Sequence, residues 1–262
     1  MFLMILWIQA QMGCLAVGWG RAGLSAGSKT QTYQKTIRNK GKKKSVTRIK
    51  GAKSLPPWGK GYTTYSWLGS GIGRQYGHHK VIDTLHAAFA SLSKTSKTTY
   101  VVAEIGWPDG RPLEGHTSHK NGMKVDILTP MRHVKTREPR QLPSHIFNLW
   151  GYCWSISPKT HRVVGTEWEI QPEYISSKRL LKKASKKRCP TTKQDLKMEV
   201  DFDAIRDLIV AVRKEAPKHG LVLSSVIIDQ SFIPKVGKTG AVLTPKAWIR
   251  HDEHLHFSFR HR

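Results

Sequence analysis

Histidines and carboxylates are concentrated in two short stretches of the chain, GHTSHKNGMKVDI at 115–127 and RHDEHLHF at 250–257. The C-terminal stretch continues as HLHFSF, whose alternation of polar and apolar side chains predicts a β-strand. Side chains two residues apart on a strand share a face, so we expect His254 and His256 to point the same way. The leucine and phenylalanines between them would face the core. Two imidazoles on one face can bind a metal ion, or one can bind it while the other transfers protons.

The first stretch offers a carboxylate and a further imidazole. The tripeptide at 120–122, Lys-Asn-Gly, is a turn signal, and it separates His119 from a predicted strand at 122–128. Asp126 lies between Val125 and Ile127 on that strand, so it should face away from the apolar side. Two imidazoles and a carboxylate, with one position left for water, describe a catalytic zinc site. On spacing alone, the alternative is a set of metal-free histidines in a basic protein.

The elements that must position these residues are both helices and strands. Apolar residues at helical spacing predict helices at 80–94 and 201–220, the second capped by Asp201 or Asp203. Stretches rich in β-branched and aromatic residues predict strands at 98–107, 122–128, 221–229 and 254–260. These elements do not alternate as regular βαβ units. The order favours a single α+β domain with a mainly antiparallel sheet flanked by helices.

The charge of the chain is strongly positive and unevenly distributed. Its 44 Lys and Arg residues against 18 Asp and Glu residues give a formal net charge of +26, and the first acid is Asp83. A second basic run lies at 177–188. Such a balance predicts a polyanionic partner: nucleic acid, an anionic cell wall or a lipid surface. The alternative is a solvated tail that keeps the protein in solution.

The N-terminal region predicts a leader followed by a linker. The apolar run at 2–8 is too short to span a bilayer, so residues 1–16 are interpreted as a signal peptide or leader, with a mis-assigned start codon as the alternative. Cys14 could also mark a lipoprotein site. Residues 17–60 are rich in Gly, Ser, Thr and Lys and predict a basic disordered linker, which leaves 61–262 as the folded domain. Without the leader, Cys153 and Cys189 remain, and they could form one disulfide or stay as two thiols.

The two histidine stretches together resemble a known family. AEIGWPDGRPLEGHTSHKNGMKVDI followed by HDEHLHFSFR is similar to the penicillin-insensitive murein endopeptidases, zinc peptidases related to D-Ala-D-Ala carboxypeptidases and lysostaphin-like enzymes. QYGHHKVIDTLHAAF at 75–89 resembles the segment upstream of the family's site, and the resemblance runs from about 61 to 262. Lys124 stands where the family more often has an acid. The family's fold would be that of the D-Ala-D-Ala metallopeptidases and hedgehog-like domains.

The resemblance implies a role for each residue of the two stretches. His119, Asp126 and His256 would be the ligands of a Zn²⁺ ion, and His254 would be the base or would stabilise the transition state. His116 and His251 would lie close by and orient water or substrate. Glu253 is the rival for the base. Strand alternation should turn it away from the metal, so we favour His254.

The implied activity is hydrolysis of the D-alanyl to diaminopimelate cross-link of peptidoglycan by an exported, periplasmic enzyme. The basic leader would bind anionic wall polymers, and no transmembrane span is expected. One alternative is a D,D-carboxypeptidase-type zinc enzyme with the same ligands. Another is a basic nucleic-acid-binding protein on the same fold, which the net charge favours. The sequence lacks a helix-turn-helix, zinc-finger or RNP pattern, so nucleic acid is the less favoured partner.

Overall fold

A computed structural model describes most of the chain from residue 51 onward. The described residues are 34–39, 42–47, 49, 51–111, 113, 118–140, 154–165, 194–245 and 251–262. All of them belong to one compact unit, Thr32–Arg262. The predicted leader at 1–16, the basic run at 177–188, both later cysteines and His116 lie outside them. No helix within the described part of the chain is both long and apolar enough to cross a membrane.

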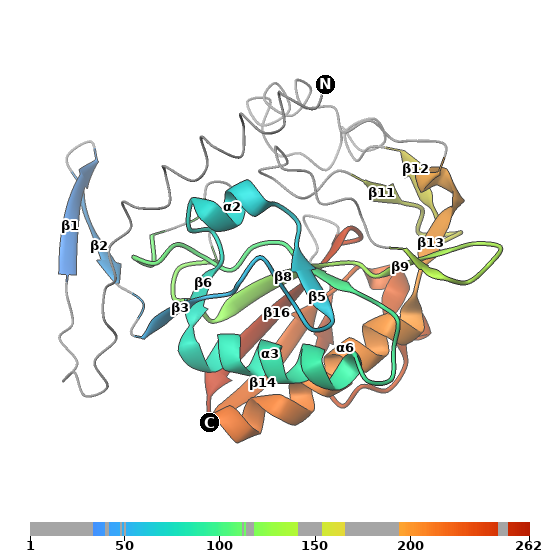
Figure 1. Ribbon diagram of the computed structural model, residues 1–262. Coiled ribbons are helices and arrows are strands. Elements are labelled where there is room, and N and C mark those ends of the chain that lie inside the picture. Colours follow the sequence, from blue (N-terminus) through green and yellow to red (C-terminus); the bar gives the residue numbers. More distant parts are fainter. Residues whose placement is uncertain are drawn as a thin grey trace, which may run out of the picture. The chain divides into compact units, whose positions relative to one another are not determined.

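A seven-stranded mixed sheet forms the centre of the domain (Figure 1). Four of its neighbouring strand pairs are antiparallel, and the pairs β5–β7 and β14–β15 are parallel. Its strands, in spatial order, are β15 (Leu243–Thr244), β14 (Leu221–Ile227), β16 (His254–His261), β8 (Lys124–Leu128), β7 (Tyr100–Val102), β5 (Tyr62–Thr64) and β4 (Trp58–Gly59). The sheet thus brings the strands of the two histidine stretches, β8 and β16, next to each other.

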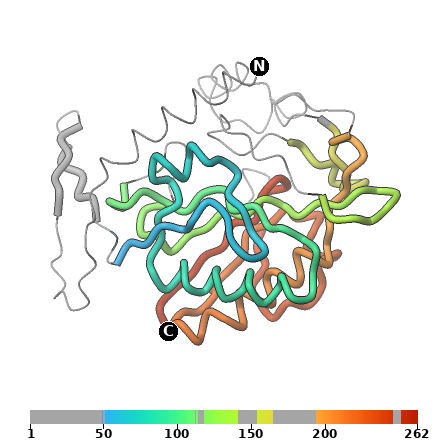
Figure 2. The backbone as a smooth tube through the Cα atoms, viewed as in Figure 1, coloured from blue at the N-terminus to red at the C-terminus, as the bar shows by residue number. Residues whose placement is uncertain are grey.

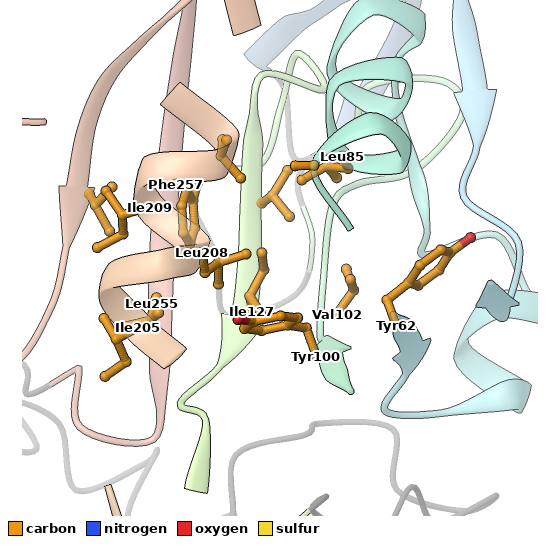
Figure 3. Close-up of a cluster of buried hydrophobic side chains, with 14 of the residues drawn as sticks. Tyr62, Leu85, Tyr100, Val102, Ile127, Ile205, Leu208, Ile209, Leu255 and Phe257 are labelled. Carbon is orange, nitrogen blue, oxygen red and sulfur yellow. The ribbon is translucent and has the colours of Figure 1, made fainter. Parts of the chain in front are cut away.

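Two long helices, α3 (His79–Leu92) and α6 (Phe202–Glu215), lie together over one face of this sheet (Figure 1). Each buries a stripe of apolar residues, including Leu85 on α3 and Leu208 on α6. These side chains pack on the apolar face of the central strands, where Leu255 and Phe257 are fully buried (Figure 3). Because removing this apolar area from water is the main driving force of folding, the contact determines which face of β16 points inward.

Shorter elements surround the central sheet. β9 (Met131–His133) pairs with β10 (Pro139–Arg140) and β13 (Met198–Val200), and β11 (Ser155–Ile156) pairs with β12 (Val163–Gly165). β3 (Ala52–Ser54) pairs with β6 (Tyr76–His78), and β1 (Gln34–Asn39) pairs with β2 (Lys42–Thr47) as a hairpin. The short helices are α2 (Trp67–Gly71), η3 (Asp195–Lys197), η4 (Ala216–His219), η5 (Gln230–Phe232) and α7 (Ile233–Val236).

The predicted α+β class with a mainly antiparallel sheet is confirmed, and so are the main elements. The helix at 80–94 is α3, and the helix at 201–220 is α6 continued by η4, with Asp201 as its N-cap. The strands at 122–128, 221–229 and 254–260 are β8, β14 and β16. The strand at 98–107 is shorter than predicted, since β7 ends at Val102. The chain after β7 still runs beside β8, because Ala103 donates a backbone hydrogen bond to Asp126 and Glu104 accepts one from it.

The prediction that folded structure begins at residue 61 is wrong for the segment just before it. β3 and β4 both precede that residue, and Leu55 between them is fully buried in the main core. The Leu55 N–H also donates to the Gln75 carbonyl at 2.8 Å. The glycines and prolines here favour a linker locally, whereas tertiary contacts make these residues part of the domain. β1 and β2 lie within the predicted linker too, and residues 1–33 are outside the described chain.

Candidate metal centre

The strands β8 and β16 bring Asp126 and His256 directly opposite each other. In the antiparallel register of this pair, His256 is the partner of Asp126 and Leu255 is the partner of Ile127. The His256 Nδ1 atom is 2.7 Å from Asp126 Oδ1. The backbone of Asp126 is held on its other side, where its N–H donates to the Glu104 carbonyl and its carbonyl accepts from Ala103, both at 2.8 Å.

The sheet face that carries the polar side chains is itself buried. Asp126 has no exposed surface, and His256 is 5% exposed. We expected this face of β16 to lie opposite the core. It does lie opposite the main core, but a second, smaller apolar cluster is present on the same side of β8. Its members are Tyr65, Val101, Ala103 and Leu128. The carboxylate and imidazole therefore lie in a low-dielectric environment, where charge interactions are stronger than in water.

His119 reaches the same point from the loop before β8. Its Nδ1 lies 2.9 Å from the Ile105 carbonyl oxygen, an acceptor that requires Nδ1 to carry the proton. Its Nε2 lies 3.2 Å from Asp126 Oδ2. The predicted turn between the two residues is present: Gly122 has φ +67°, and a Cβ there would lie 2.5 Å from the His78 nitrogen. Only glycine fits this close approach, so Gly122 helps to place His119 beside the strand.

His119, Asp126 and His256 form a compact group of possible metal ligands. One ligand atom from each lies within 4.8 Å of the other two, and all three residues are buried. The bond from His119 to a backbone carbonyl matches the way in which metal-binding histidines are oriented through their second ring nitrogen. Two imidazoles and a carboxylate are a donor set that suits Zn²⁺ and other divalent transition metals. The residues present therefore fit a metal ion.

The electrostatics of this group favour a positive charge beside the carboxylate. Burial alone would raise the pKa of Asp126, but His119, His256 and His254 hold that pKa well below its usual value. Burial lowers the pKa of His119, and the charge and hydrogen bond of Asp126 more than offset this, so the net shift is upward. A buried carboxylate that stays ionised between imidazoles is ready to bind a cation.

Two further histidines lie beside the three candidate ligands. The rings of His251 and His254 have centroids 4.7 Å apart, and those of His251 and His256 lie 6.4 Å apart. His254 Nδ1 lies 3.0 Å from Glu253 Oε1. Our expectation that strand alternation turns Glu253 away does not apply, because β16 begins at His254 and Glu253 lies in the bend before it. The structure thus shows Glu253 in contact with the favoured base.

The bend at 251–253 is anchored to the residue that follows β8 and to β11. The Thr129 N–H donates to the Glu253 carbonyl at 2.9 Å, and the Thr129 hydroxyl donates to the Asp252 carbonyl at 2.6 Å. The Asp252 side chain accepts from the Ile156 N–H at 2.8 Å through Oδ2. These three bonds fix the segment that carries His251. The sequence did not predict the roles of Thr129 and Asp252. Nothing in the neighbouring residues distinguishes a side chain that bonds to distant backbone from one that is exposed on the surface.

A buried ion pair at Glu104, whose carbonyl accepts from the Asp126 N–H, was also missed. Arg74 and Glu104 form a salt bridge in which the Arg74 side chain is 5% exposed and that of Glu104 is fully buried. The Tyr65 hydroxyl lies 3.2 Å from Glu104 Oε1. The sequence did offer a sign of this pair, because Glu104 is an acid inside the apolar stretch YVVAEIGW. An acid buried in such a stretch needs a partner of opposite charge. Lys124, the departure from the family pattern, donates to the Ser258 hydroxyl on β16 at 2.7 Å.

The structure therefore defines an α+β protein with a buried His, Asp, His group and two adjacent histidines. Comparison with known proteins agrees with this class. The family model described as penicillin-insensitive murein endopeptidase matches residues 42–188, more than half of the chain. The chain belongs to this family. The matched range includes His119 and Asp126, whereas the histidines of β16 lie beyond it.

One curated relative supports the same assignment. It is the penicillin-insensitive murein endopeptidase of Haemophilus influenzae, which is 36% identical to this chain over 84 residues. The aligned stretch is 32% of this chain and 28% of the relative, so less than a third of the relative's length is matched.

Proposed function

We propose that the protein is a zinc-dependent endopeptidase that hydrolyses D-alanyl-diaminopimelate cross-links in peptidoglycan. The observation that carries this proposal is the buried His119, Asp126 and His256 group, with its ligand atoms within 4.8 Å of one another. Membership of the murein endopeptidase family supports the substrate class. We further propose that the protein acts outside the cytoplasm, in the periplasm, where this substrate is found.

His119, Asp126 and His256 would hold the zinc ion. When bound, the ion would polarise the scissile carbonyl and lower the pKa of water toward about 7. The chain's own contribution to this centre is to keep the carboxylate ionised and the imidazoles oriented. The Ile105 carbonyl fixes the ring of His119, and the register of β8 and β16 fixes Asp126 against His256.

His254 would move the proton during hydrolysis. In the overall reaction water adds a hydroxyl group to the carbonyl carbon and a proton to the departing amine, and the amide C–N bond breaks. Glu253 contacts Nδ1 of His254, so protons would be exchanged through the other ring nitrogen, Nε2. His251 packs against His254 and would help to position it. His116, in the part of the chain that the structure leaves undescribed, stays a predicted neighbour of the site.

The test is metal analysis of the purified full-length chain combined with digestion of cross-linked peptidoglycan. We expect one zinc per chain, conversion of cross-linked muropeptide dimers to monomers, and loss of this activity when a chelator removes the metal. A D,D-carboxypeptidase would instead release free D-alanine from monomeric pentapeptides. Release of D-alanine without loss of dimers would favour that alternative, and a metal-free protein that leaves both substrates intact would contradict the proposal.

A further inference from the structure

A patch of exposed apolar residues lies at the β4 end of the central sheet. Trp58 on β4 is 63% exposed, and Trp67 at the start of α2 is 54% exposed. Leu68 and Ile72 beside them are 40% and 48% exposed. Exposed apolar residues that gather in one place, rather than singly, mark interaction sites. Together these four residues form the tryptophan patch.

The two indoles of the patch contact each other instead of packing into the core. Their ring centroids are 5.8 Å apart at an interplanar angle of 63°, an edge-to-face arrangement. Trp58 is held by the pairing of β4 with β5, and Trp67 follows Ser66, whose hydroxyl caps α2 by accepting from the Gly69 N–H at 2.9 Å. Both indoles are therefore carried by hydrogen-bonded backbone while large parts of their surfaces stay open to solvent.

The chain around the patch carries one exposed cation, Lys60 in the turn between β4 and β5, in contrast to the strongly basic rest of the protein. Residues 61–73, GYTTYSWLGSGIG, contain no Lys, Arg, Asp or Glu in a chain of net charge +26. The next cation, Arg74, is 4% exposed and paired with Glu104, so its charge is neutralised below the surface. A surface for a polyanion would present several Lys or Arg side chains. A surface with open indole faces, along which Lys60 is the one exposed cation between residues 58 and 73, instead matches a sugar ring, whose C–H groups stack on aromatic faces and whose hydroxyls stay in water.

The position of the patch fits the geometry of peptidoglycan. From β8, which carries Asp126, the sheet order runs through β7 and β5 to β4, which carries Trp58. Three steps of about 4.8 Å between neighbouring strands place β4 roughly 14 Å from β8. A stem peptide of about four residues, at 3.3–3.6 Å per extended residue, spans about the same distance between its cross-linked end and the sugar that carries it.

We propose that the tryptophan patch binds sugar rings of the peptidoglycan glycan strand, a role that rests on the proposed function of the metal centre. The patch would hold the strand while its stem peptide reaches the metal centre. It would thereby favour cross-links within the wall polymer over free cross-linked peptides. The residues that bind the sugar would be Trp58 and Trp67, and neither belongs to the metal centre.

The test measures binding of the full-length protein, at high salt, to glycan strands from which the stem peptides have been removed. High salt screens the attraction between the net charge of +26 and the lactyl carboxylates that this removal leaves on the strand. Intrinsic fluorescence and co-sedimentation would report the binding. We expect Trp58→Ala and Trp67→Ala each to weaken it about tenfold, which corresponds to roughly 1.4 kcal/mol. Trp67→Phe, which keeps an aromatic face, should retain more affinity than Trp67→Ala. The control Leu196→Ala removes a side chain that is 49% exposed on η3, away from the patch, and should bind as wild type does.

Other outcomes would overturn the inference. Absence of glycan binding by the wild-type protein, or equal binding by wild type and both alanine variants, would do so. The inference would also be wrong if the variants bound glycan as wild type does but no longer bound phosphatidylglycerol vesicles, since the patch would then be a lipid-binding surface. It would likewise be wrong if they bound glycan normally but no longer self-associated in ultracentrifugation, since the patch would then join two copies of the chain. Cleavage of a sugar-free cross-linked peptide separates the two proposals, because it needs the metal centre alone. Trp-dependent glycan binding without that cleavage would support the inference and contradict the proposed function.

Discussion

His256 Nδ1 and Asp126 Oδ1 lie 2.7 Å apart on neighbouring strands, although the two residues are 130 positions apart in the chain. This contact unites the two histidine stretches into one centre, and His119 completes it from the loop before β8.

The first prediction concerns the metal ligands. Replacing His119, Asp126 or His256 by Ala should each reduce bound zinc at least about tenfold, because each removes one of three donors. Metal content measured by mass spectrometry on dialysed protein would test this. His219→Ala, which changes a histidine in η4 outside the centre, is the matched control and should keep its metal. One equivalent of zinc retained in all three variants would contradict the ligand assignment.

A second prediction separates the base from the ligands. His254→Ala should keep the metal and lower kcat by about 10²–10⁴-fold, the usual contribution of a general acid or base. Glu253→Gln keeps the size of a side chain that contacts His254 Nδ1, so it should have a smaller effect. Steady-state cleavage of a cross-linked muropeptide provides the measurement. If Glu253→Gln abolishes turnover while His254→Ala remains active, Glu253 is the base.

The third prediction concerns pH and a histidine outside the centre. Burial first, and then the nearby His79, His261 and Lys80, lower the pKa of His78 to about 4. His78 Nδ1 accepts from the Lys80 N–H at the start of α3, and the His78 and His261 ring centroids lie 5.1 Å apart. The backbone places the C-terminal end of the chain near the start of this helix (Figure 2). Protonation would remove this cap and place a positive charge at a helix N-terminus, which is unfavourable.

Acid should destabilise the folded chain through His78, because folding lowers the pKa of this residue. His78 binds a proton near pH 6.5 in the unfolded chain but only near pH 4 in the folded chain. Between these two values the unfolded chain binds more protons, so the free energy of unfolding falls as the pH is lowered from about 6.5 to about 4. His78→Asn keeps a good N-cap without a titrating group. Denaturant unfolding between pH 7 and pH 4 should show the variant losing less stability than wild type. If the free energy of unfolding falls equally with pH in both proteins, protonation of His78 does not destabilise the fold.

The fourth prediction tests the corrected start of the folded domain. Leu55→Ala should lower the free energy of unfolding by about 2–5 kcal/mol, the usual cost of truncating a buried leucine. Leu68→Ala, at a position that is 40% exposed, should change it by about 0.5 kcal/mol or less. Urea unfolding of both variants is the measurement. An equally small effect at both positions would place residue 55 outside the core.

The fifth prediction concerns the basic N-terminal region. A chain that begins at Ile49 retains β3 and Leu55, so it should keep its zinc and cleave soluble cross-linked peptides as the full chain does. It should bind whole sacculi less tightly at low salt, because Lys and Arg attraction to anionic wall polymers is lost. At about 0.1 M salt charges are screened over roughly 10 Å, and at high salt the two proteins should bind alike. A difference that persists at high salt would indicate contacts other than charge.

Local sequence patterns predicted which side chains share a face. Alternation in HLHFSF places His254 and His256 opposite Leu255 and Phe257, and the structure has this arrangement because the apolar side packs on α3 and α6. The same reasoning placed Asp126 away from Val125 and Ile127. Helix periodicity and the Asp201 cap located α6, since both signals depend on residues only a few positions apart.

Tertiary structure alone decided how these faces meet. The register that sets His256 against Asp126 joins strands about 130 residues apart, and no local pattern specifies it, because a shift by two residues keeps the same side chains on the same face. The carbonyl of Ile105 on His119 and the contact of Glu253 with His254 depend on backbone positions that have no residue-type signal. Burial of Leu55 likewise follows from packing against distant helices and strands. The sequence therefore determined the chemistry of the centre, and the pairing of distant strands determined its geometry.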